Sequence, residues 1–235
     1  MRIDWYSQKG QSRERNCDAA SYCETSHGLA IGLVDASERQ ASQQFAHHWA
    51  KTIVSAAVSS GFDLGGALIT AALKEAQAGL RETFLHQIAS YSLVVINRKS
   101  GAGAVLSVGD CLVGVSGTNK PSKSGTNWLN TPHTAEAQLQ SHGLADAVLP
   151  GAQHLLTRSI NARRFHEPDI HSFRICNGYK LILATDGYWR EYGGDAAVDL
   201  KQLQDDASYL ALTWGESPLE LEQNSDMANL LPLDI

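Results

Sequence analysis

The chain has 235 residues, 43% of them hydrophobic, which is enough for one sizeable core. Its net charge is −6 and no basic block appears, so the composition gives no support for nucleic-acid binding. No apolar run approaches the length of a membrane span, and the N-terminus does not resemble a signal peptide. The four cysteines have no CxxC spacing, which is typical of free thiols in a reducing cytoplasm.

The first half of the chain predicts two strands, two long helices and a pair of strands. In chain order these elements cover residues 3–7, 29–35, 38–60, 66–88, 90–97 and 102–116. Ser37 is the candidate N-cap of the first helix, and 10–18 is a charged loop. We expect 90–97 and 102–116 to be successive strands of an antiparallel meander.

The second half predicts shorter elements. They are a helix at 134–143, strands at 170–175 and 179–186, helices at 188–193 and 198–204, and a strand at 208–212. Residues 117–133 are polar and turn-rich, and Asn177-Gly178 predicts a hairpin into the strand that follows. From Trp214 onward the chain is acidic and irregular. We therefore expect one domain over 1–213 and a loosely docked tail over 214–235.

Several predicted strands end on an acidic residue. The apolar run Leu181–Ala184 leads to Asp186 and a glycine, and similar runs lead to Asp35 and Asp110. A further acidic pair, Asp205-Asp206, opens the last predicted strand. One such pattern alone indicates an ordinary Asp-Gly turn. Repeated, it predicts an all-oxygen site at one rim of a sheet, which suits hard cations such as Mg²⁺ or Mn²⁺.

Five motifs together resemble a known family. They are Gly10 and Arg13 with Asn16-Cys-Asp18, the strand Ala30–Ala36, Ser107–Cys111, the approach from Leu155–Ser159 through Glu167–Ile170 to Leu181–Gly187, and Asp205–Ser208. Each motif is weak alone, but their order and spacing resemble the metal-dependent serine/threonine protein phosphatases of type 2C (PPM). The resemblance covers about residues 1–213. It implies an α+β fold, a four-layer α/β/β/α sandwich of two mainly antiparallel sheets flanked by helix pairs.

The resemblance also assigns roles to individual residues. Asp35 would bridge two Mg or Mn ions, the main-chain carbonyl of Ala36 would ligate one of them, and Asp186 and Asp205 would ligate the other. Asp18 would hold water next to the ions, Arg13 would bind the substrate phosphate, and Asp110 would help to hold a third, weaker ion. Asp35, Asp18 and Arg13 are thus the expected catalytic residues. Asp206 stays open as the alternative to Asp205.

The function implied is hydrolysis of phosphoserine and phosphothreonine in proteins by a water activated between the two ions. Its partners would be a phosphorylated protein substrate and a serine/threonine kinase that acts with it, and the enzyme would be a cytoplasmic monomer. Two alternatives stay open: a catalytically weak relative that serves as a scaffold or binds phosphoproteins, and a hydrolase of another phosphoester.

Some positions depart from the family pattern. Ala36 replaces a glycine, Cys17 replaces an acid or amide, and position 37 holds serine, so a histidine general acid is absent there. Cys17 and Cys111 each neighbour a site aspartate. They are either redox controls or buried thiols, and the second interpretation is favoured. The histidines at 27, 133, 142, 154, 166 and 171 lack metal-ligand spacing, and we expect surface or core roles for them.

Overall fold

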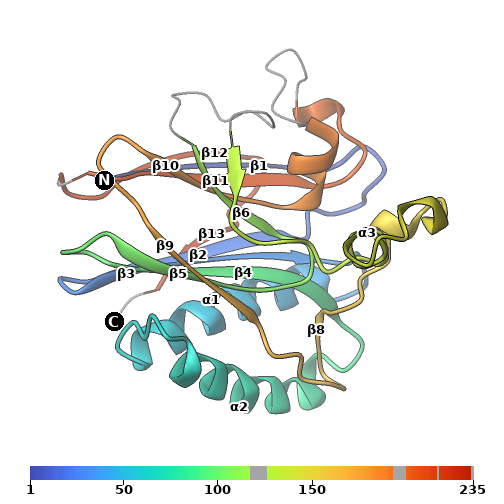
Figure 1. The fold of residues 1–235 in the computed structure, drawn as a ribbon, viewed down its shortest axis with the longest axis horizontal. Helices are drawn as coiled ribbons and strands as arrows, with labels where there is room; N and C mark the ends of the chain where they lie inside the picture. The colour runs from blue at the N-terminus through green and yellow to red at the C-terminus, as the bar shows by residue number, and fades with distance from the viewer. Residues whose placement is uncertain (117–125, 193–199, 216, 234–235) are drawn as a thin grey trace.

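Two β-sheets packed face to face form the centre of the computed structural model, which describes residues 1–116, 126–192, 200–215 and 217–233 (Figure 1). The first sheet has the order β12-β1-β11-β10-β6-β7. Its strands are β1 Arg2–Gln8, β6 Leu112–Ser116, β7 Thr126–Trp128, β10 Lys180–Ala184, β11 Ala207–Thr213 and β12 Glu220–Ser225. All its pairings are antiparallel except that of β1 with β12.

The second sheet has the order β13-β2-β3-β4-β5-β9, with the short β8 paired to β4. Its strands are β2 Asp18–Glu24, β3 Gly28–Ala36, β4 Ile88–Asn97, β5 Ala102–Val108, β8 Ile160–Asn161, β9 Asp169–Arg174 and β13 Leu230–Pro232. Only the pairing of β2 with β13 is parallel. The predicted mainly antiparallel sandwich is confirmed.

Apolar side chains from both sheets fill the space between them. Trp5, Leu33 and Leu183 are fully buried in this layer, and each comes from a strand whose side chains alternate between two faces. The indole N–H of Trp5 donates to Asn229 Oδ1 at 2.9 Å, so its one polar atom is satisfied within the core.

The helices cover both outer faces unequally. On the second sheet lie α1 (Ser42–Ser59) and α2 (Ala67–Thr83) (Figure 1). Phe45 and Trp49 of α1 are buried in the core beneath it. On the first sheet the layer is thin, because it consists of short segments, η3 (Gly187–Tyr192) and η4 (Leu200–Gln202). The remaining helical segments are α3 Ala135–Ser141, η1 Ala145–Ala147 and η2 Ala152–His154. No helix in the described ranges is long and apolar enough to cross a membrane.

The two long helices are shorter than predicted. The first begins at Ser42 rather than 38, its N-cap is Ala41, and Ser37 accepts a hydrogen bond from the Ser42 hydroxyl through its carbonyl. The Ser37 N-cap prediction is therefore wrong, and residues 37–41 form a loop. The second helix ends at Thr83 instead of 88, because strand β4 already begins at Ile88.

The antiparallel pairing of β4 with β5 confirms the predicted meander. Two other expectations, one continuous strand over 102–116 and a hairpin at Asn177-Gly178, are wrong for a shared reason: the chain changes sheets there. Residues 102–116 form β5 in the second sheet and β6 in the first, separated at Gly109-Asp110. Asn177-Gly178 does not close a hairpin, since β9 pairs with β5 whereas β10 pairs with β6 and β11. Local turn chemistry is the same whether the next strand joins its neighbour or crosses over.

The segment after Thr213 was expected to be a loosely docked tail, but it adds one strand to each sheet. Strand β12 extends the first sheet beside β1, and β13 extends the second beside β2. Asn229 is fully buried, and its amide donates to Ser7 Oγ at 2.7 Å and to the Asp18 carbonyl at 3.0 Å. In this structure the segment from 217 to 233 is thus part of the sandwich. Within two other predicted segments, residues 117–125 and 193–199 lie outside the described ranges.

Candidate active site

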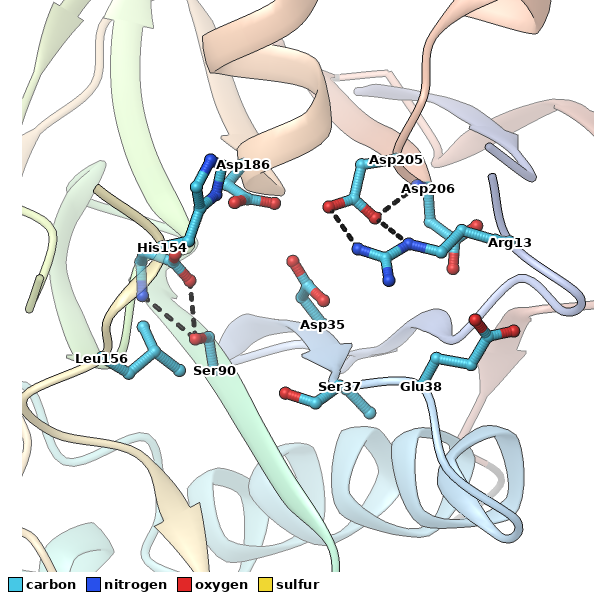
Figure 2. Close-up of a pocket in the computed structure, with 12 residues that line it drawn as sticks. Arg13, Asp35, Ser37, Glu38, Ser90, His154, Leu156, Asp186, Asp205 and Asp206 are labelled. Atoms are coloured by element: carbon cyan, nitrogen blue, oxygen red, sulfur yellow. Dashed lines mark hydrogen bonds and ion pairs between the residues drawn. The ribbon is translucent and has the colours of Figure 1, made fainter. Parts of the chain in front are cut away.

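A polar pocket of about 130 Å³ opens at the end of the sandwich where the two sheets meet. It is lined by Arg13, Asp35, Ala36, Ser37, Glu38, Ser90, Asp110, His154, Leu156, Asp186, Asp205 and Asp206. Figure 2 shows Asp35 in the middle, with Asp186 on one side and Asp205 and Arg13 on the other. The structure therefore brings together residues that are far apart in the chain.

The second sheet supplies one row of polar residues. Asp18 opposes Asp35 in the pairing of β2 with β3, and Asp35 opposes Ser90 in the pairing of β3 with β4. The Ser90 hydroxyl donates to Asp110 Oδ1 at 2.7 Å and accepts from the Asp110 N–H at 3.1 Å. Because cross-strand neighbours share a face of the sheet, these side chains gather at one rim.

A glycine makes the Asp110 position possible. Gly109 has φ 98°, and a Cβ there would overlap Ser90. Glycine adopts this backbone without steric cost, so the chain turns sharply after β5 and places Asp110 beside Ser90. The indole N–H of Trp189 donates to the Asp110 carbonyl at 2.9 Å and holds the turn from the other sheet.

The first sheet supplies the other acids. Strand β10 ends shortly before Asp186, and β11 begins directly after Asp206. Because the two strands are antiparallel neighbours, these two ends lie side by side. At Gly187 a Cβ would overlap the Asp206 carbonyl, so the Asp-Gly turn lets the two chain segments touch. Asp186 thus lies beside the start of β11.

The adjacent acids Asp205 and Asp206 have different environments. Asp206 is 6% exposed, and its carboxylate accepts from the N–H of Gly10 at 3.0 Å and of Cys17 at 2.8 Å. It therefore fastens the 10–17 loop to the sheet. The Asp205 carboxylate instead pairs with the Arg13 guanidinium through two bonds of 2.6 and 2.7 Å.

Arg13 sits on a loop that is held at several points. Glu38 Oε1 accepts from the N–H of Glu14 at 2.8 Å and of Arg15 at 2.9 Å, which ties this loop to the segment after β3. The bidentate pair with Asp205 raises the pKa of Arg13 further above its ordinary value, so its charge is permanent.

The acids of the site destabilise one another in their charged forms. Burial raises the pKa of Asp35 well above its usual range, and the charges of Asp18 and Asp186 add to it. Burial, followed by Asp110 and Asp205, raises the pKa of Asp186 to about 7. A divalent cation among these carboxylates would oppose both pKa shifts, since its charge favours the ionised form.

One buried carboxylate oxygen, Asp18 Oδ1, has no hydrogen-bond partner among the described residues. Asp18 is 1% exposed; its Oδ2 accepts from the Thr185 hydroxyl at 3.1 Å, whereas its Oδ1 makes no hydrogen bond. An orphaned carboxylate oxygen beside other acids fits a water or cation nearby. The available ligand atoms are all oxygens, mostly from carboxylates, and this is the type of ligand that Mg²⁺ and Mn²⁺ prefer.

The acids do not form a ready-made ligand set, however. In the described residues no three His, Cys, Asp or Glu side chains stand together as ligands of one ion. The Arg13 pair engages the Asp205 carboxylate, so ion binding at Asp205 requires the side chains to shift. Ala36 has a negative φ, because Phe62 is the one non-glycine residue of positive φ in the described ranges. The backbone at this position therefore does not require the glycine that the resemblance led us to expect.

The cysteines next to the site are buried. Cys17 is 1% exposed and Cys111 is fully buried. Burial, together with nearby carboxylates, raises the pKa of the Cys17 thiol to about 12 and that of Cys111 well above its ordinary value. Both thiols are therefore protonated at neutral pH, which favours the interpretation as buried thiols.

Five lining residues were not predicted for the site: Ser37, Glu38, Ser90, His154 and Leu156. Ser90 and Glu38 act by hydrogen bonds to distant segments, which leave no pattern in the sequence. His154 directly precedes the motif segment Leu155–Ser159 but belongs to no ligand pattern itself, so only the fold places it at the pocket.

Comparison with known proteins supports the fold. No family model matches the chain, and no curated protein matches its sequence. Among solved structures, the S. agalactiae serine/threonine phosphatase matches with a TM-score of 0.70 at 17% identity, over 89% of this chain and 97% of that one. Stp1 of Staphylococcus aureus gives 0.68 at 16%, over 91% and 95%. The catalytic domain of the phosphatase PstP with 2 manganese ions gives 0.59 at 15%, over 89% and 96%.

Proposed function

We propose that this chain, which has the fold of the PPM-type serine/threonine phosphatases, is a Mg- or Mn-dependent hydrolase of phosphoserine and phosphothreonine in proteins. The observation that carries the proposal is the pocket where Asp35, Asp186 and Asp205 meet beside Arg13. The neighbours with this fold include a phosphatase bound to 2 manganese ions.

The residues divide into ion-holding and substrate-binding groups. Asp35 lies between Asp186 and Asp205 and would be shared by two ions, with the Ala36 carbonyl as a further ligand. Asp110 would help to hold a third ion, and Asp18 would accept from water through its free oxygen. When bound, such ions supply a nucleophilic water and offset the charge on the phosphoryl oxygens.

Arg13 would bind the phosphate. Its planar guanidinium presents a fork of N–H donors that matches phosphoryl oxygens. In the structure two of these N–H groups bind Asp205, and Figure 2 shows the remaining terminal nitrogen turned away from Asp205. The arginine is thereby held at the edge of the pocket where a substrate phosphate would enter.

The test is hydrolysis of a phosphothreonine peptide by the purified protein with and without millimolar manganese. We expect activity that depends on manganese and is lost in Asp35→Asn, which keeps the shape of the side chain but removes its charge. Asp146→Asn is a control, since Asp146 is exposed and lies outside the pocket lining. No turnover by folded wild-type protein with manganese would contradict the proposal.

A second candidate, a phosphoprotein-binding relative with weak catalysis, is favoured by one observation: Asp205 is already paired with Arg13. If this pair persists, the ion at Asp205 binds weakly. Calorimetry with manganese separates the two functions, because the hydrolase requires binding of two ions and the scaffold requires none.

A further inference from the structure

The site contains one imidazole whose role is unassigned. Among the described residues that line the pocket, His154 is the one histidine. It is the last residue of η2, it is exposed, and Figure 2 shows it on the Asp186 side of the pocket, across from Arg13. A phosphate held by Arg13 over Asp35 would present its far side toward this histidine.

The segment after His154 is held in place by main-chain contacts. The Leu155 carbonyl accepts from the Ala135 N–H at 2.8 Å, and the Thr157 N–H donates to the His133 carbonyl at 2.8 Å. An isolated bridge pairs Leu156 with Thr134 between them. His154 therefore stands at the start of a short strand-like segment rather than on a free loop.

The neighbouring segment around His133 is in turn hydrogen-bonded to Gly109, the residue before Asp110. The His133 N–H donates to the Gly109 carbonyl at 2.8 Å, and the Gly109 N–H donates to His133 Nδ1 at 2.9 Å. The other ring nitrogen of His133 bonds Asp169 at 2.8 Å. Because Gly109 directly precedes Asp110, these bonds set the position of the His154 segment relative to the aspartates.

Hydrolysis of an alkyl phosphate needs a proton at the leaving oxygen, since an alkoxide is a poor leaving group. Position 37 holds serine, which does not donate a proton of suitable acidity. Arg13 keeps its proton permanently, and the carboxylates would be ionised when they hold cations. Among the lining residues this leaves the imidazole of His154 as the side chain that can carry a proton and pass it on.

We propose that His154 donates the proton to the leaving serine or threonine oxygen, an inference that rests on the proposed function. Water forms the new bond to phosphorus and loses one proton to solvent. The phosphorus–oxygen bond of the substrate breaks with its electron pair on the leaving oxygen, which takes the N–H proton of the imidazolium. The neutral imidazole then regains a proton from solvent.

The test compares two substrates in the full chain with manganese. A phosphothreonine peptide needs the proton, whereas p-nitrophenyl phosphate releases an anion that is stable without it. His154→Gln should lower kcat for the peptide by about 10²–10⁴-fold and leave kcat for p-nitrophenyl phosphate close to that of the wild type. His142→Gln, an exposed histidine outside the lining, is the matched control and should change neither.

A second variant tests the same role by rescue. His154→Ala with added imidazole should regain part of its activity toward the peptide, since a free imidazole can occupy the vacated space. Equal loss on both substrates, a change in KM alone, or no loss would overturn the inference while leaving the phosphatase function intact. A wild-type protein inactive on both substrates would instead overturn the proposed function, and this inference with it.

Discussion

Replacing Asp206 and Asp205 one at a time should separate stability from activity at neighbouring positions. Asp206→Ala removes the acceptor of two buried N–H bonds, from Gly10 at 3.0 Å and from Cys17 at 2.8 Å. Bonds to an ionised acceptor contribute about 1.5–3 kcal/mol each, so the gross loss is about 3–6 kcal/mol.

Part of this loss is offset by the removal of a buried charge. Burial raises the pKa of Asp206 from 3.8 to about 6, although the two N–H bonds oppose the shift. The ionised carboxylate is therefore less favourable in the folded protein than in the unfolded chain, and its removal offsets part of the loss of the two bonds. We therefore expect Asp206→Ala to lower the free energy of unfolding by about 2 kcal/mol.

Asp205→Ala should behave differently. Its partner Arg13 has a side chain 35% exposed, so solvent screens the pair and its contribution is about 1 kcal/mol or less. Under the proposed function, however, this variant loses manganese-dependent hydrolysis. The adjacent substitution thus affects stability little and activity strongly.

Urea unfolding followed by tryptophan fluorescence measures both variants, with Trp5 and Trp49 buried in the two cores as reporters. The midpoint should fall for Asp206→Ala at an unchanged m-value. If Asp205→Ala were the more destabilising of the two, the assignment of Asp206 as the structural residue would be refuted. Asp206→Ala with wild-type stability would refute it equally.

Four further predictions follow from the structure. The pKa of Asp186 is raised to about 7 in the folded protein, so the folded state binds its proton more tightly than the unfolded chain. The metal-free protein should therefore lose stability as pH rises from about 4 to about 7, and manganese should raise Tm more at pH 8 than at pH 5; a rise in metal-free stability across this range would contradict the argument. Gly109→Ala should lower the free energy of unfolding by about 1–3 kcal/mol, because its backbone has φ 98° and a Cβ meets a neighbouring strand; wild-type denaturant midpoints would speak against it. Asn229→Ala should cost about 2–4 kcal/mol, since it removes buried hydrogen bonds to Trp5 and Ser7 of β1 and to Asp18 of β2, and an unchanged Tm would show that residues 217–233 dock loosely after all. Iodoacetamide should label the exposed Cys176 and leave Cys111 unmodified in the folded protein, with mass spectrometry as the readout; fast labelling of Cys111 would reopen a redox role.

The sequence by itself determined the local features of this protein. The apolar runs that end in Asp35, Asp110 and Asp186 depend only on neighbouring residues, and they form strands β3, β5 and β10 at or near the predicted places. Helical spacing likewise located α1 and α2, apart from their ends. Strand β2 was not predicted, because Asp18–Glu24 contains small residues in place of a long apolar run.

Only the tertiary structure decided which sheet each strand joins. The chain crosses between sheets after Val108 and after Arg174, and strand pairing there depends on contacts distant in the sequence. The exposed residues of β12 carry no apolar pattern, since an edge strand can remain polar while its backbone pairs with β1. That long-range pairing brings the acids together and places His154 at the pocket. It also gives Asp205 and Asp206 different hydrogen-bond partners.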